Sequence, residues 1–453
     1  MKDYSQLISN QRDFFNTNAT KSIAFRVDAL KKIYNWTRSH VDEICLALKH
    51  DLNKSKFEAY ATEIGIVLTE ISHTLKHIKK WAKPKRVRTP LTSFKAKSFV
   101  LSEPFGVSLV MSPWNYPFQL SIVPLVAAIS AGNCVVLKPS AYSPATSQLI
   151  FDMIEELFDK KFVSVILGGR EENAGLLDQK FDYIFFTGGV NVGKTVMACA
   201  SKNLTPVTLE LGGKSPCIID KSADIKLTAK RLIWGKLING GQTCIAPDYV
   251  YVHKSLKDSI VSEIQKNITE FYGENPLIND SYPKMVNKKH FDRVSQMIEK
   301  VIVGGNVDQN SLKIEPTLID ATWESKAMQE EIFGPVLPIL TYEDLNEVIS
   351  VVKSKPKPLA LYLFAKDKQV QNKVLESVSF GGGCINDTIM HIATSNMPFG
   401  GVGNSGMGCY HGKYSFDTFS HKKSVLNKSL AFDMKLRYPP YKDNISLLKK
   451  VQK

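Results

Sequence analysis

The chain has 453 residues, of which 43% are hydrophobic and 23% charged, a composition typical of a globular protein with a large buried core. Its seven cysteines include no CxxC pair, which argues against a disulfide scaffold or a cysteine-rich zinc site and indicates a reducing, cytoplasmic location. The formal net charge is +14, but the lysines are dispersed and no RNA-binding aromatic motif occurs, so we expect no nucleic-acid partner.

Residues 1–80 are predicted to be helical, because segments such as SIAFRVDALKKIYNWTRSHVDEICLALKHDL repeat apolar residues at helical intervals. The first residues, MKDYSQLISNQRDFF, have no apolar core and do not resemble a signal peptide. His73 and His77 share one helical face, as metal ligands can, but no HExxH glutamate or third ligand accompanies them. We therefore expect a solvated helix face there, and no metal site.

The helical pattern ends at Pro84 and Pro90, and LTSFKAKSFVLSEP after them is typical of extended strands. The basic run KKWAKPKRVR (79–88) is interpreted as a solvated face or connector, with attraction of an anionic surface or cofactor as the alternative. The tail from Lys435 is also basic with some apolar residues, so weak surface association stays open for it.

An uncharged stretch from Pro104 to Leu137 is long enough to suggest a membrane span. Pro113, Pro117 and Pro124 interrupt it, and a lipid-exposed helix would leave freed backbone groups unsatisfied there. We therefore predict a buried strand, loop and helix, and no membrane span.

Strand and helix patterns alternate from residue 105 to about 210. The apolar runs GVSLVMSP, NCVVLKPS, FVSVILGG and FDYIFFTGG each end in glycine, proline or serine, as in βαβ units of a parallel sheet. Ligands of such sheets bind beyond the carboxyl ends of the strands. The alternation resumes from 211 to about 400, with SPCIID and YVYVHK among its strands, and predicts a second α/β domain.

The segment GGVNVGKT (188–195) matches the phosphate-binding pattern GxxxxGK[ST], and it lies between a predicted strand and a predicted helix. Asp220, after an apolar strand, could serve as the magnesium-binding acid of an NTPase, with Lys194 in the loop. A turn that cradles a dinucleotide pyrophosphate is the alternative, because close backbone approach and a helix N-terminus favour either anion. The motif alone does not decide between the two.

Five further segments bear on that choice: PWNYP (113–117), FTGG (186–189), LELGGK (209–214), GQTC (241–244) and QEEIFGP (329–335). Together and in this order they closely resemble the aldehyde dehydrogenase superfamily. Two segments near the end, MPFGGVGNSGMG and YHGKYSFDTFSH, resemble its class 3 branch. The resemblance extends from about residue 10 to 425.

The residue types fit the chemistry that the resemblance implies. A thiolate that adds to an aldehyde gives a thiohemiacetal, which can release a hydride and leave a thioester. Cys244 would be this nucleophile, and Asn115 would donate to the adduct oxygen together with the backbone N–H of Cys244. Glu210 would be the general base for the water that hydrolyses the thioester. The other readings are a core cysteine, a turn residue between prolines and a salt-bridged glutamate.

The resemblance also implies NAD or NADP as cofactor. Lys138 would bind the adenosine ribose, Glu331 the nicotinamide ribose and Phe333 the ring, although core packing is the other reading of Phe333. The pyrophosphate turn would comprise Thr187, Gly188, Gly189, Val190, Asn191, Val192 and Gly193. Many NAD-preferring members have glutamate after Lys-Pro-Ser, where this chain has Ala141. A 2′-phosphate would not meet a carboxylate there, so we expect NADP to be tolerated.

The resemblance implies an α/β fold with three parts. A Rossmann-type dinucleotide-binding domain would comprise 1–84 and 104–210, an α/β catalytic domain 211–400, and a small antiparallel bridging and oligomerisation element 85–103 and 420–453. In the family this element supports dimers, so a homodimer is expected.

The substrate would be a medium or long aliphatic, or an aromatic, aldehyde. A cofactor-free thioester or ester hydrolase using Cys244 and Glu210 is the remaining alternative.

Overall fold

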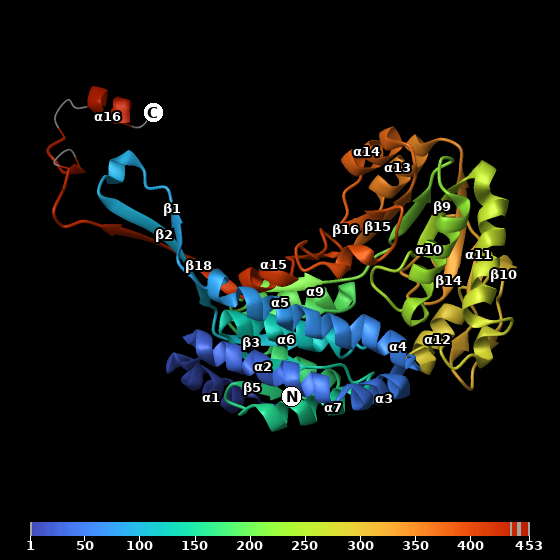
Figure 1. Cartoon of the computed structure of the whole chain (residues 1–453), viewed down its shortest axis with the longest axis horizontal. Helices are drawn as coiled ribbons and strands as arrows, with labels where there is room; N and C mark the ends of the chain where they lie inside the picture. Colours follow the sequence, from blue (N-terminus) through green and yellow to red (C-terminus); the bar gives the residue numbers. More distant parts are fainter. Residues whose placement is uncertain (1, 435–436, 442–444, 452–453) are drawn as a thin grey trace.

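The computed structural model describes residues 2–434, 437–441 and 445–451. Two helix-covered sheets lie side by side, and a thin arm projects from the first of them (Figure 1). The N-terminal region is helical as predicted, and it packs on the first sheet and its helices. Its helices are α1 (Ser5–Asn16), α2 (Ile23–Ser39), α3 (Val41–Leu52), α4 (Lys56–Ala59) and α5 (Gly65–Trp81), with a π-helical turn, η2 (Tyr60–Ile64), between the last two.

The first sheet has six strands in the order β17-β7-β6-β3-β4-β5, all parallel except β17. The four predicted apolar runs form β3 (Val107–Met111), β4 (Cys134–Lys138), β5 (Val163–Val165) and β6 (Tyr183–Thr187), followed by β7 (Val207–Glu210). The helices between them are α6 (Gln119–Ala131), α7 (Pro144–Leu157), α8 (Arg170–Leu177) and α9 (Val190–Ser201).

The uncharged stretch is a buried strand, loop and helix, as expected: β3 and α6 are buried along their whole length. In the described part of the chain, no helix is long and apolar enough to cross a membrane. Because parallel strands end at one edge, Lys138, Thr187 and Glu210 lie along that edge as the last residues of β4, β6 and β7.

The second sheet has seven strands in the order β10-β13-β14-β9-β8-β15-β16, and β10 alone among them is antiparallel to its neighbour. Its strands are β8 (Pro216–Ile219), β9 (Tyr249–His253), β10 (Val301–Val303), β13 (Thr317–Asp320), β14 (Val336–Tyr342), β15 (Ala360–Phe364) and β16 (Gly382–Ile385). Its helices are α10 (Ile225–Leu237), α11 (Lys257–Tyr272), α12 (Lys288–Ser295), α13 (Leu345–Ser354) and α14 (Lys368–Ser377). The pair β11 (Val307–Asp308) and β12 (Lys313–Ile314) forms a separate hairpin.

The chain then returns to the first sheet. β17 (Gly406–Met407) pairs with β7, and α15 (Gly412–Thr418) packs on α5 and α6. The sequence patterns assign no element to this return. Its structural consequence is that residues near 395–412 form part of the wall around the end of β7.

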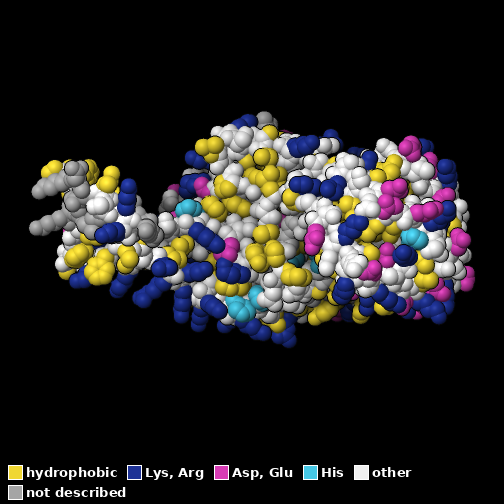
Figure 2. All heavy atoms as spheres, turned by 90° about the horizontal axis from the view of Figure 1, so that it is seen from above, with side chains coloured by type: hydrophobic (Ala, Val, Ile, Leu, Met, Phe, Trp, Pro, Cys, Tyr) yellow, Lys and Arg dark blue, Asp and Glu magenta, His cyan; other side chains and the backbone are white. Residues whose placement is uncertain are grey.

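The arm is a three-stranded antiparallel sheet of β1 (Lys85–Val87), β2 (Ala96–Pro104) and β18 (Ser420–Lys428), followed by α16 (Ile445–Val451). The basic run 79–88 is almost entirely solvent-exposed, as a solvated face should be. Figure 2 shows lysine and arginine side chains gathered where the arm joins the body. A groove of about 890 Å³ at this junction is lined by Lys21, Lys31, Lys79, Lys83 and Lys423.

Candidate active site

The ends of β6 and β7 and the loop after α10 meet around one cavity of about 480 Å³. Thr187, Glu210 and Cys244, which are far apart in the sequence, all line it. Most of its remaining wall is apolar, with Leu120, Val123, Trp234, Ile238, Leu359, Ile389, Ile392 and Phe399 among the lining residues.

Cys244 follows a tight turn, η4 (Ile238–Gly241), at the end of α10. Asn239 and Gly240 adopt left-handed backbone conformations there, with φ of 53° and 59°. Such conformations are natural for glycine and tolerated by asparagine, so GG in the sequence and an asparagine before it permit the reversal. The reversal directs the loop that carries the cysteine toward the end of the first sheet.

The loop that carries Cys244, which we call the cysteine loop, is held by hydrogen bonds of the residues before and after the cysteine. Before it, Thr243 Oγ1 lies 2.6 Å from the hydroxyl of Tyr116. After it, the hydroxyl of Tyr362 donates to the carbonyl oxygen of Ile245 at 2.5 Å. These contacts hold the thiol in one place against the cavity, as a nucleophile requires.

Burial, together with the nearby Glu331 and Glu210 carboxylates, raises the pKa of Cys244 to about 12. The backbone N–H groups of Cys244 and Ile245 act in the opposite direction. The Cys244 thiol is therefore protonated at neutral pH, and its activation needs a nearby positive charge or a base.

Glu210 is buried at the end of β7, and burial raises its pKa well above the usual range. Neither of its carboxylate oxygens has a hydrogen-bond partner among the residues that the structure describes. A buried, unpaired carboxylate is costly for a folded protein. A cavity-lining carboxylate of this kind is therefore a candidate functional group.

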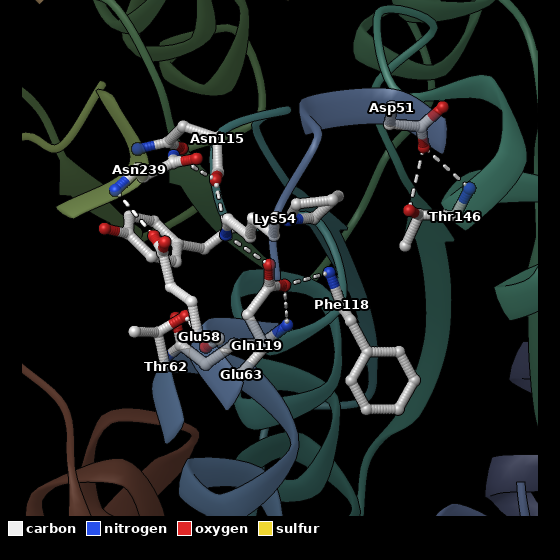
Figure 3. A network of polar contacts seen from close by, with 12 residues as sticks. Asp51, Lys54, Glu58, Thr62, Glu63, Asn115, Phe118, Gln119, Thr146 and Asn239 are labelled. Carbon is white, nitrogen blue, oxygen red and sulfur yellow. Dashed lines mark hydrogen bonds and ion pairs between the residues drawn. The ribbon is translucent and has the colours of Figure 1, made fainter. Parts of the chain in front are cut away.

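Asn115 lies between β3 and α6, beside Asn239 of the turn η4 that precedes Cys244 (Figure 3). Its side-chain Nδ2 donates to the carbonyl oxygen of Gln242 at 3.0 Å. Its own carbonyl oxygen accepts from Asn239 Nδ2 at 2.7 Å and from Lys54 Nζ at 3.2 Å. The amide is thus fixed toward the segment that carries Cys244, two residues beyond Gln242.

The glycine-rich turn follows β6 at the same edge of the sheet. Thr187 Oγ1 is buried and has no hydrogen-bond partner in the described part of the chain. A side chain on Gly188 would begin 2.6 Å from the ring of Phe186, whereas Gly189 faces open space. The backbone is therefore accessible to a ligand at Gly189, where α9 begins.

The first turn of α9 contains Val190, Asn191 and Val192, which are partly or fully exposed. Their N–H groups have no partner within the helix, and the helix dipole adds positive potential at this end. Gly193 lets α9 approach β7 closely, because a Cβ there would lie 2.7 Å from Leu211 Cδ2. This end of α9 can therefore bind an anion near the cavity.

Lys138 ends β4 and is buried, with Nζ donating to the carbonyl oxygens of Gly168 at 2.7 Å and Pro139 at 2.8 Å. Burial lowers its pKa to about 8. Ala141, three residues further on, is exposed. A ligand that extends from the start of α9 along this edge would find an ammonium group here and no carboxylate at Ala141.

The loop with Glu331 and Phe333 also lies near the cysteine, since the Glu331 carboxylate raises the pKa of the Cys244 thiol. Glu331 is partly exposed, and its carboxylate packs so closely on Gly212 that a Cβ there would lie 2.1 Å from Oε2. Burial of the carboxylate within the site raises its pKa to about 8. Phe333 has a left-handed φ of 51°, and its ring packs edge-on against Trp114. Such backbone strain is concentrated at functional positions.

Three residues that the sequence analysis did not single out hold this loop in place. Lys214 pairs with Asp248 and also donates to the carbonyl oxygens at 327 and 330. Asp248 accepts from the backbone N–H of Ile332 at 2.9 Å. Arg293 donates to the carbonyl oxygens of Glu331 and Ile332. Lys214 ends the LELGGK motif, but no pattern marks the other two.

The NTPase interpretation of GGVNVGKT fails on the position of its acid. Asp220 ends β8 in the seven-stranded sheet, whereas the glycine-rich turn follows β6 in the six-stranded sheet. Asp220 instead accepts from the backbone N–H of Ser222. His73 and His77 have no third ligand beside them, because the described residues contain no cluster of three metal-ligating side chains.

The Cys244 thiol and the unpartnered Glu210 carboxylate thus share one largely apolar cavity, and an open turn that can bind an anion lies beside it. Such an arrangement suits covalent catalysis next to a bound dinucleotide. The sequence model described as "Aldehyde dehydrogenase family" matches residues 1–425. The chain belongs to this family, and it is an NAD(P)-dependent enzyme that oxidises aldehydes to acids.

Aldehyde dehydrogenases from other organisms are similar to this protein over nearly its whole length. The "4,4'-diaponeurosporen-aldehyde dehydrogenase" of Staphylococcus aureus is 48% identical, over 99% of both chains. The mouse "Aldehyde dehydrogenase, dimeric NADP-preferring" is 45% identical over 97% of this chain and 98% of its own. The solved structure "Substrate bound state of Staphylococcus Aureus AldH" superposes with a TM-score of 0.98 at 48% identity and covers 100% of both chains.

Proposed function

We propose that this enzyme oxidises apolar aldehydes, with Cys244 as nucleophile, Asn115 as oxyanion donor and Glu210 as general base. The observation that carries the proposal is the unpartnered, buried Glu210 carboxylate on the same apolar cavity as the Cys244 thiol. A hydrolase without cofactor would use the same two residues, but it leaves Glu331, Phe333 and the turn before α9 without a role.

The protein offers a fitting place for NAD or NADP. The buried Thr187 hydroxyl lacks a partner in the described chain, and the open backbone at Gly189 leads into the first turn of α9. We assign the pyrophosphate to Thr187, Gly188, Gly189, Val190, Asn191, Val192 and Gly193, the adenosine ribose to Lys138, and the nicotinamide ribose and ring to Glu331 and Phe333. When bound, the oxidised nicotinamide would supply the hydride acceptor, and its positive charge would favour the Cys244 thiolate.

The first step is addition of the Cys244 thiolate to the aldehyde carbon. A carbon–sulfur bond forms, and the carbonyl electron pair moves onto oxygen. One of the two N–H groups on Asn115 Nδ2 is used by Gln242, so the second can donate to this oxyanion, together with the backbone N–H of Cys244. Each such donor typically lowers the barrier by about 3 kcal/mol.

Loss of hydride leaves a thioester on Cys244, which water must hydrolyse. Glu210 accepts a proton from this water as the water oxygen attacks the thioester carbon, and the thiolate leaves with the carbon–sulfur electron pair. Because burial raises the pKa of Glu210, its ionised form is a stronger base than an exposed carboxylate. The acid product then departs through the cavity.

The cavity wall supports a substrate with a large apolar part. Tyr60, Trp234 and Met390 line the cavity and are also 46%, 39% and 48% exposed, so the cavity reaches solvent between apolar side chains. The S. aureus relative is named for an aldehyde of the diaponeurosporen series. We therefore assign medium or long aliphatic, or aromatic, aldehydes as the substrate class.

This assignment is tested with acetaldehyde, hexanal, decanal and benzaldehyde, each with NAD and with NADP. We expect kcat/KM to rise with aliphatic length, by about 0.8 kcal/mol or roughly four-fold for each buried CH₂ until the cavity is filled. We also expect NADP to be used, because Ala141 presents no carboxylate to a 2′-phosphate, and Ala141→Glu to shift the preference toward NAD. Equal rates for all lengths would contradict the substrate class, and inert NADP would contradict the role of Ala141.

We further propose a cytoplasmic homodimer, in which 85–103 and 420–453 form the oligomerisation element, 1–84 with 104–210 the dinucleotide-binding domain and 211–400 the catalytic domain. The projecting arm exposes Leu91, Phe94 and Leu426, which a second copy would cover, and the mouse relative is named dimeric. Light scattering at micromolar concentration should give twice the chain mass. A monomer would refute the dimer.

A further inference from the structure

Lys54 and Glu63 form an ion pair that is completely buried, with 2.5 Å between Nζ and Oε1 (Figure 3). Lys54 follows α3, and Glu63 lies in the π-helical turn η2. Removing two charges from water costs several kcal/mol per ion, and apolar residues of the same size often stabilise a fold as well. The proposed chemistry uses neither residue, so stability alone does not explain the pair.

The pair holds the segment that contains Asn115 at two points. Lys54 Nζ donates to the carbonyl oxygen of Asn115 at 3.2 Å and lies 3.9 Å from the centre of the Tyr116 ring. Glu63 Oε2 accepts from the backbone N–H groups of Phe118 at 2.9 Å and Gln119 at 3.2 Å. The loop between β3 and α6 is therefore fixed along its length by one buried pair.

A second contact connects the same point to the cysteine loop. Asn239 Nδ2 donates to the Asn115 carbonyl oxygen, so this oxygen receives two donors from opposite sides of the site. The backbone N–H of Asn239 in turn donates to Glu58 Oε1 at 2.6 Å. With the main chain of Asn115 fixed in this way, its side-chain amide is directed at the carbonyl oxygen of Gln242.

Glu63 lies in the π-helical turn η2, which also contributes residues to the wall of the substrate cavity. Such turns are rare and occur frequently at functional sites, because the extra residue changes which side chains share a face. Here Tyr60, Ala61 and Thr62 of the turn line the substrate cavity, while Glu63 points into the buried network. One short segment therefore forms cavity wall and also supports the loop of Asn115.

We propose that the Lys54–Glu63 pair is a positioning device that orients the Asn115 amide toward the oxyanion formed at Cys244. The inference rests on the proposed role of Asn115 and extends it to two residues that touch no reacting atom. A displacement of about 1 Å at a positioned donor can reduce a rate by about 100-fold. The pair therefore acts on the rate of thioester formation, and not on binding of the aldehyde.

The test is the double variant Lys54→Met/Glu63→Gln, assayed as the full-length enzyme. It removes both charges together, so no unpaired charge is buried, and the new amide oxygen can still accept from the start of α6. We expect single-turnover NADH formation to slow by about 10- to 100-fold while KM stays nearly unchanged.

The matched control is Asp51→Asn, since Asp51 is a buried carboxylate that caps α7 through Thr146 and does not contact the Asn115 loop. It should retain the wild-type rate.

A double-mutant cycle with Asn115→Ala separates positioning from a general structural effect. If the pair acts through the Asn115 amide, the double variant should change the Asn115→Ala rate by less than about two-fold. A full additional loss in the Asn115→Ala background would overturn the positioning inference and leave the oxyanion assignment intact. A wild-type rate for Asn115→Ala itself would instead refute the oxyanion assignment, and the inference with it.

Discussion

Cys244→Ala is expected to abolish both aldehyde oxidation and any hydrolysis of activated esters. Without the thiol no covalent adduct forms, and the hydride has no tetrahedral carbon from which to leave. Loss of a covalent nucleophile typically reduces kcat by about 10⁴- to 10⁶-fold. Steady-state NADH or NADPH formation with hexanal would measure the loss, and p-nitrophenyl acetate would measure the esterase activity.

Cys384→Ala is the matched control for this variant. Cys384 is also a partly buried thiol, and its Sγ lies 3.6 Å from Nδ1 of His391, but it does not line the cavity. This variant should retain wild-type activity. Substantial oxidation by Cys244→Ala, or its loss in Cys384→Ala, would mean that the nucleophile has been assigned to the wrong cysteine.

Glu210→Gln is expected to form the thioester and then stop. Cys244 and Asn115 are intact, so a single burst of NADH should appear with each active site, followed by turnover reduced about 10²- to 10⁴-fold. Rapid mixing followed at the NADH absorbance separates the burst from the steady rate. Multiple turnovers at the wild-type rate would exclude Glu210 as the base.

The same substitution should stabilise the fold as the pH rises. Burial raises the pKa of Glu210, so the unfolded chain loses this proton at lower pH than the folded chain. Between those two pKa values the folded state holds the extra proton, and the free energy of unfolding falls by up to about 1.4 kcal/mol per pH unit. Glutamine has no such proton. The Tm of Glu210→Gln should therefore exceed that of the wild type increasingly as the pH rises above about 4.5, the ordinary pKa of a glutamate.

The residues predicted for this site came from the resemblance to the aldehyde dehydrogenases, and the strand pattern explains why three of them lie together. Lys138, Thr187 and Glu210 end apolar runs, and parallel strands place such ends at one edge. The glycine-rich turn was ambiguous in the sequence, because phosphate and pyrophosphate sites share one physical basis. Asp220 and the turn lie on separate sheets, so the acid that the NTPase interpretation needs is not beside the turn.

Other parts of the site depend on contacts between distant segments. No sequence pattern marks Lys54 or Glu63, yet both are fully buried and contact the segment that contains Asn115. Asp248 and Arg293 likewise fix the loop of Glu331 without any motif of their own. A charged residue gives no signal of burial in one sequence, since burial depends on a partner supplied elsewhere in the fold.

The most direct test of the account is mass spectrometry of Glu210→Gln after mixing with hexanal and NAD. The account predicts an acyl group attached to the peptide that contains Cys244, in an amount equal to the NADH formed in the burst. Acylation at another cysteine, or NADH without any acylated peptide, would contradict a thioester on Cys244 as the central intermediate.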